Sequence, residues 1–251
     1  PGEPGYEASR VLMTEEVNAV VEGCFQGGAT EITVCDSHEI SQNLRFDLLD
    51  ERVNLISGCT RDGSMVHSID STYDGLILLG HHAMFGTQNA VLDHTYDQYM
   101  IRELKVNGTA LGEFGLNSLV AAEKGVPVIM TSGDDALERE AKAFCSDVNV
   151  AVVKKAEGRY CAKCLPKVDC RRLLTETARK AVSEASERKC VEVPASPVLE
   201  ITFQQTCMAD GTMRVKDIRR TGPMTVEYTC SSMEEVMDMR QVISDAAGEF
   251  F

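Results

Sequence analysis

Apolar residues along the chain follow two periods, one typical of helices and the other typical of buried strands. Residues 8–25 carry valines and leucines at helical spacing and stop before Gly27 and Gly28, so this segment predicts a helix. Short apolar runs follow it, several of them rich in β-branched residues, and each predicts a buried strand. The predicted strands are residues 31–35, 53–57, 75–80, 126–131 and 148–153.

Two further helical patterns lie between these strands, at residues 113–124 and 134–144. The second follows Ser132-Gly-Asp-Asp135, a helix start in which an aspartate caps the first turn. Because strands and helices alternate, the first part of the chain predicts a three-layer α/β domain with a mainly parallel sheet. Asn107-Gly108 adds one antiparallel hairpin.

The regular alternation of predicted strands and helices ends after residue 155. A charged helical pattern covers residues 168–187, strands are predicted at 197–204 and 224–230, and an acidic helix at 232–247. We therefore predict an α/β domain over residues 1–155 and a smaller α+β unit over residues 156–251. No long linker marks the boundary.

Composition narrows the class of protein. Its 251 residues are 43% apolar and 25% charged, which is typical of a globular protein, and its longest apolar runs are far shorter than the about 20 residues of a spanning helix. The net charge is −14 and no block of basic residues occurs, so nucleic acid and anionic membranes are poor partners.

Ten cysteines are scattered along the chain, several of them inside apolar patterns. This density is lower than in disulfide scaffolds, so we predict reduced thiols and a cytoplasmic location. The first five residues lack the basic and apolar regions of a signal peptide. Because the sequence does not begin with Met, we expect further residues upstream of Pro1.

Histidine spacing gives the sharpest chemical signal. His38 lies three residues after the predicted strand that ends at Cys35, and His82 lies two residues after Gly80. Ligands of open α/β sheets bind beyond the carboxyl ends of the strands, so both imidazoles are expected at one crevice. Glu113, at the start of a predicted helix, completes a set of ligands for a metal such as Zn²⁺. The alternative is that these residues only cap helices or lie at the surface.

Other candidate groups carry weaker signals. His67 and His81 gain no support from the strand argument. Cys161 and Cys164, with Cys170 nearby, suggest a redox or zinc site, but no second pair completes four ligands and the pattern around them predicts a helix. A structural role for these cysteines is the favoured interpretation.

Six motifs, in this order, together resemble the zinc D-aminopeptidases of the dipeptide-transport-operon type. They are MTEEVN (13–18), VCDSH (34–38), LGHHA (79–83), VLDHT (91–95), GEFGLN (112–117) and SGDD (132–135). The resemblance covers nearly the whole chain and implies a two-zinc hydrolase.

The resemblance implies roles for individual residues. His38, His82 and Glu113 fall on metal-ligand positions, and His94 falls on a catalytic position, where it could move a proton, stabilise the oxyanion or attack as a nucleophile. The family's remaining ligands come from an N-terminal strand with an Asp-x-Glu-Gly signature. No such motif precedes Tyr6, so we expect this strand upstream of the sequence, and two zinc ions per chain if it is present.

Two further residues are candidates for orienting the ligands or the substrate. Asp36 could orient an imidazole, although an aspartate at this position could equally form a turn. Asn117 could bind the substrate backbone or simply pack one helical turn after Glu113.

The function that the resemblance implies is a zinc-dependent aminopeptidase. It would remove N-terminal residues, D residues in this family, from short peptides or amides through a metal-bridged water, and would assemble into a ring-like homo-oligomer. The alternative is a non-catalytic oligomeric protein of the same fold that binds peptides or metal. A thiol-based redox or zinc-storage protein is a third hypothesis.

Overall fold

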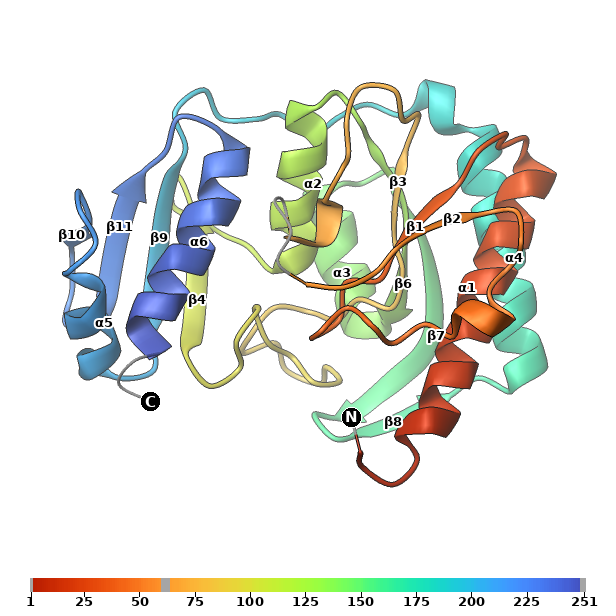
Figure 1. Cartoon of the computed structure of the whole chain (residues 1–251), viewed down its shortest axis with the longest axis horizontal. Coiled ribbons are helices and arrows are strands. Elements are labelled where there is room, and N and C mark those ends of the chain that lie inside the picture. The colour runs from red at the N-terminus through yellow and green to blue at the C-terminus, as the bar shows by residue number, and fades with distance from the viewer. Residues whose placement is uncertain (1, 60–63, 249–251) are drawn as a thin grey trace.

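The computed structural model describes residues 2–59 and 64–248, which form three β-sheets with helices packed around them (Figure 1). The central sheet of the larger body has four strands. In spatial order they are β3 (Leu76–Leu78), β6 (Val128–Asp134), β7 (Asn149–Gly158) and β8 (Cys161–Cys164). Strands β3, β6 and β7 run parallel and β8 runs antiparallel to β7, so the predicted mainly parallel α/β fold is confirmed.

Helices cover both faces of this sheet and make three layers. They are α1 (Tyr6–Gly27) and α4 (Lys167–Ser183) on one face, and α2 (Glu113–Glu123) and α3 (Asp135–Phe144) on the other. Neighbouring residues of β6 show the two faces directly. Val128 packs in the cluster of α2 and α3, whereas Ile129 packs in the cluster of α1 and α4.

A separate two-stranded parallel sheet, β1 (Thr33–Cys35) and β2 (Asn54–Ile56), packs against α1. Strand β1 leads into the loop that carries His38.

The second body is an antiparallel sheet with a helical cover. Its strands, in spatial order, are β10 (Arg219–Arg220), β11 (Thr225–Thr229), β9 (Val198–Phe203), β4 (Ile101–Val106) and β5 (Thr109–Ala110). Helices α5 (Thr206–Thr212) and α6 (Met233–Gly248) pack on it. Short 3₁₀ turns occur at Phe46–Leu48 (η1), Ser64–Val66 (η2) and Ala185–Glu187 (η3).

The two predicted sequence ranges are interleaved in space. Strand β4, from the first range, pairs with β9 from the second, and α4, from the second range, packs along α1. Strand β7 runs through the expected boundary at residue 155. The predicted domain boundary between residues 155 and 156 therefore stays a prediction.

The helical prediction for the segment with Cys161 and Cys164 is wrong. These residues form β8, which pairs with the end of β7 in a hairpin, and the helix begins later, at Lys167 after Pro166. Pairing with β7 outweighs the local pattern, because it satisfies backbone groups along a strand that extends to Gly158. All ten cysteines are free thiols.

Within residues 2–59 and 64–248, no helix combines the length and apolar character that crossing a membrane requires.

Two glycines let α1 and α4 approach closely. A Cβ added at Gly23 would lie 2.2 Å from the Thr175 carbonyl oxygen, and one at Gly27 would lie 2.6 Å from the Arg179 carbonyl oxygen. Both obstacles are backbone atoms, which cannot turn away as a flexible side chain can.

Replacing Gly23 with alanine is therefore expected to destabilise the protein. An atom 2.2 Å from a backbone oxygen belongs at the upper end of the cost of overpacking, about 3 kcal/mol, and alanine's better helix propensity returns about 1 kcal/mol, so the free energy of unfolding should fall by about 2 kcal/mol. Denaturant unfolding measures this change. Gly158→Ala is the control, because no atom lies within 4 Å of a Cβ there. Equal stability of Gly23→Ala and wild type would contradict the close packing.

Candidate metal centre

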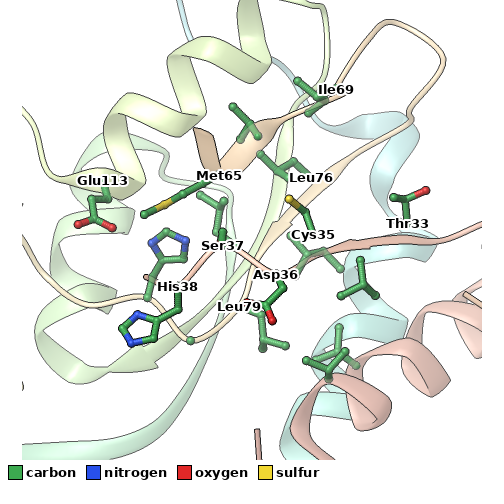
Figure 2. Close-up of a pocket in the computed structure, with 18 of the residues that line it drawn as sticks. Thr33, Cys35, Asp36, Ser37, His38, Met65, Ile69, Leu76, Leu79 and Glu113 are labelled. Carbon is green, nitrogen blue, oxygen red and sulfur yellow. The ribbon is translucent and has the colours of Figure 1, made fainter. Parts of the chain in front are cut away.

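One cavity brings together chemically active side chains from both bodies. Its wall includes His38 from the loop after β1, His82 from the loop after β3, His94 from the loop before β4, and Glu113 at the start of α2. Figure 2 shows Glu113, His38 and Met65 on one side of this cavity, with Cys35 and Thr33 of β1 farther along it.

Three of these residues form a compact group. The ligand atoms of His82, His94 and Glu113 all lie within 4.8 Å of one another. The Nε2 atoms of His82 and His94 lie 3.5 Å and 3.8 Å from Glu113 Oε1. Ligands of a tetrahedral zinc with bonds of about 2.0–2.1 Å stand about 3.3 Å apart, so the spacing fits such an ion.

The hydrogen bonds of the two imidazoles fix which nitrogen faces the group. His82 Nδ1 lies 3.1 Å from the Ala83 carbonyl oxygen, and His94 Nδ1 lies 2.6 Å from the Leu92 carbonyl oxygen. Since a carbonyl oxygen only accepts, each Nδ1 carries a proton and donates it. In the neutral rings both Nε2 atoms therefore present lone pairs to a carboxylate. Acceptors at such short range suit a cation, and an outer hydrogen bond of this kind orients metal-binding histidines.

Burial and charge set the protonation of the group. Burial opposes the charge of Glu113, but contact with His82 outweighs it and holds the carboxyl pKa at about 2. Burial also opposes charge on His82, yet the Glu113 carboxylate raises its pKa above the ordinary 6.5. The pKa of His94 is lowered, mainly by burial and then by neighbouring His82. His94 is thus the imidazole that keeps its lone pair more readily.

Glu113 is placed by a hairpin and by a backbone donor. Asn107 and Gly108 both adopt positive φ between β4 and β5, so the predicted Asn-Gly hairpin is confirmed, and the chain then enters α2 through Gly112. The Tyr96 backbone N–H donates to Glu113 Oε1 at 2.8 Å. This bond ties the loop that bears His94 to the carboxylate.

Long-range bonds hold the rest of the His94 loop. The Val91 N–H donates to Asp134 Oδ2 at 2.7 Å, and the other oxygen of Asp134 caps α3, as the sequence predicts. Arg159 binds the carboxylate and the carbonyl of Asp93, the residue before His94. Sequence reasoning missed Arg159, because only the fold brings it to the histidine loop.

His38 lines the same cavity but does not belong to the compact group of described ligand atoms. Asp36 orders the loop that carries His38. The Asp36 carboxylate accepts the Asn43 N–H at 2.5 Å and the Leu44 N–H at 2.8 Å, and the Asn43 side chain donates to the His38 carbonyl. This pattern corresponds to the turn-forming role considered for Asp36.

Asn117 lies one helical turn after Glu113 and is fully buried. Its Nδ2 lies 3.2 Å from Met65 Sδ, its Oδ1 has no hydrogen-bond partner within the described part of the chain, and it does not line the cavity. His81 lines the cavity, 6.5 Å from the His82 ring.

Comparison with known proteins gives matches along nearly the whole chain. A profile of the family described as D-aminopeptidase matches residues 1–242. A D-aminopeptidase of Bacillus subtilis (strain 168) is 34% identical over 247 residues, covering 98% of this chain and 89% of that protein. The solved Zn-dependent D-aminopeptidase DppA from Bacillus subtilis, described as a self-compartmentalizing protease, matches with a TM-score of 0.95 at 34% identity, covering 98% and 89% of the two chains. The resemblance inferred from the six motifs is confirmed.

The acceptor group predicts binding of a divalent cation. Zn²⁺ should raise the melting temperature of the protein, and Glu113→Gln should weaken zinc affinity by more than about tenfold, since it removes the charge that faces both imidazoles. Titration calorimetry measures the affinity. Glu176→Gln, at an exposed position on α4, is the control. Unchanged affinity in Glu113→Gln would exclude this group as the binding site.

The same titration should depend on pH. Zinc needs unprotonated imidazole, and the pKa of His82 is raised, so protons begin to compete already above the ordinary value of 6.5. Affinity should therefore fall as the pH is lowered through that region, and an affinity that rises on acidification would contradict the assignment.

Proposed function

The chain belongs to the D-aminopeptidase family, and we propose on this premise that it is a zinc-dependent aminopeptidase that removes N-terminal residues, preferably D residues, from short peptides or amides. The observation that carries the proposal is the contact of two imidazole Nε2 atoms with one buried carboxylate oxygen inside a cavity. The comparisons favour this function over a non-catalytic binding protein of the same fold.

We assign His82 and Glu113 as zinc ligands and His94 as the catalytic residue. The rings of His82 and His94 are stacked, with centroids 3.8 Å apart and planes inclined by 18°. Nearly parallel rings direct their Nε2 lone pairs side by side rather than toward one point. This arrangement suits one ligand and one adjacent proton carrier better than two ligands of the same ion.

The number of zinc ions per chain is part of the proposal. We propose two, as the family resemblance implies, with His38 serving a second ion from its place in the wall of the same cavity. The imidazole of His38 is a donor that suits zinc at this second place.

Zinc, when bound, supplies a Lewis acid that polarises the scissile carbonyl and lowers the pKa of water. The residues of the chain supply orientation and proton transfer. His94 Nδ1 is held by the Leu92 carbonyl, so Nε2 is its free nitrogen, and the lowered pKa leaves that nitrogen unprotonated before reaction. His94 Nε2 accepts the proton of the attacking water and passes it to the leaving amine, which departs neutral.

Glu113 would stay ionised as a zinc ligand during this exchange, because the bound cation would stabilise its negative charge. It therefore does not compete with His94 for the proton. Its second task is mechanical, since it fixes the loop of His94 through the Tyr96 N–H.

We also propose that the chain forms a homo-oligomer, with a ring-like arrangement that would limit access to short substrates. Support comes from the related Bacillus subtilis enzyme, whose solved structure is described as a self-compartmentalizing protease. A cytoplasmic location stays a prediction from the free cysteines.

Replacing His94 tests the assignment. His94→Gln should keep its zinc and lose about 10²–10⁴-fold in kcat on D-alanine p-nitroanilide, the range of general acid–base catalysis. Elemental analysis and steady-state kinetics on the same preparation measure both quantities. Chelation of the wild type should abolish turnover, and zinc should restore it.

His67→Gln is the matched control, because His67 lines the same cavity outside the compact group. It should keep both zinc and activity. Loss of zinc in His94→Gln would make His94 a ligand, and full activity of the chelated wild type would overturn the proposed function.

A further inference from the structure

Arg240 is a buried cation in the wall of the cavity that holds the histidines and Glu113. It lies on α6 and is only 5% exposed. Its Nη2 donates to Gln241 Oε1 at 3.1 Å, and its Nε has no hydrogen-bond partner among residues 2–59 and 64–248. Across the part of the chain that the structure describes, Arg240 forms no ion pair, so no described carboxylate compensates its charge.

An uncompensated buried charge is strongly destabilising, and this chain does not lack carboxylates. Its net charge is −14, and α6 itself carries Glu234 and Glu235 in its first turn. Nevertheless the described carboxylates leave Arg240 unpaired. A guanidinium that lines a cavity without a carboxylate partner is suited to bind a negatively charged group of a ligand.

Tyr96 places Arg240 close to the reacting centre. The guanidinium carbon lies 4.0 Å from the centroid of the Tyr96 ring, and the backbone N–H of the same tyrosine donates to Glu113 Oε1. One residue therefore separates the guanidinium from the proposed zinc ligand. Helices α6 and α2 pack next to each other (Figure 1).

We propose that Arg240 binds the C-terminal carboxylate of a short peptide whose first peptide bond lies at His94 and Glu113; this inference rests on the proposed aminopeptidase function. The planar fork of arginine matches a carboxylate with two parallel hydrogen bonds. Arg240 thus selects free peptides over amides and longer chains.

The test compares two substrates with the same reacting residue, D-alanyl-D-alanine and D-alaninamide, of which only the dipeptide carries a carboxylate. Arg240→Met keeps an apolar stem over Tyr96 and removes the charge. It should lower kcat/KM for the dipeptide by about 10- to 100-fold, mostly through KM, because a charge-assisted pair is lost. The amide should stay within about twofold of the wild-type value.

Two further variants control for charge and folding. Arg240→Lys keeps a cation without the fork and should retain part of the preference for the dipeptide. Arg219→Met removes the same charge from a side chain that is 72% exposed on β10, and should change neither substrate. Equal losses on both substrates in Arg240→Met would mean that Arg240 only supports Tyr96, and no loss on either would also overturn the inference.

Binding measurements separate this inference from the proposed function. If the wild type with zinc hydrolyses neither substrate, the aminopeptidase function fails. Titration calorimetry then compares the affinities of D-alanyl-D-alanine and its C-terminal amide, which differ only in the carboxylate that Arg240 would bind. Tighter binding of the free dipeptide, lost in Arg240→Met, supports the site, and equal binding of the two ligands overturns it.

Discussion

The structure depends on keeping one carboxylate charged in a place that water hardly reaches. The side chain of Glu113 is only 4% exposed, and a buried charge is stable only with partners. The Tyr96 N–H binds one of its oxygens, and His82 and His94 approach the same atom. Because these partners come from the loop before β4 and the loop after β3, the charge of Glu113 holds the two loops, and with them His82 and His94, in place.

The remainder of the fold supplies rigid supports for those loops. The Val91 N–H donates to Asp134, which caps α3. Arg159, which follows β7, binds Asp93, the residue before His94. Helix α2 begins at Glu113 because the β4–β5 hairpin turns the chain there, and β4 belongs to the antiparallel sheet. The site is therefore built where the two bodies meet, and α6 brings Arg240 to it from the end of the chain.

Local pattern predicted most of the elements, because periods of two and 3.6 residues report burial directly. The spacing of His38, His82 and Glu113 pointed to the cavity that all three line. The β8 strand was missed, since its pairing with β7 outweighs local preference. Spacing also could not place His94, whose loop requires positive φ at Leu92 and Tyr96 and bonds to distant residues. Arg240 belongs to no recognisable sequence motif, and only its burial beside Tyr96 in the structure identifies it as a candidate binding residue.

The most direct test of the account is a crystal structure of the zinc-loaded protein with anomalous diffraction recorded at the zinc edge. The account predicts an anomalous peak about 2.0–2.2 Å from His82 Nε2 and from a Glu113 carboxylate oxygen, with His94 beside it. A peak at Cys161 and Cys164 instead, with none in the cavity, would contradict the proposed centre.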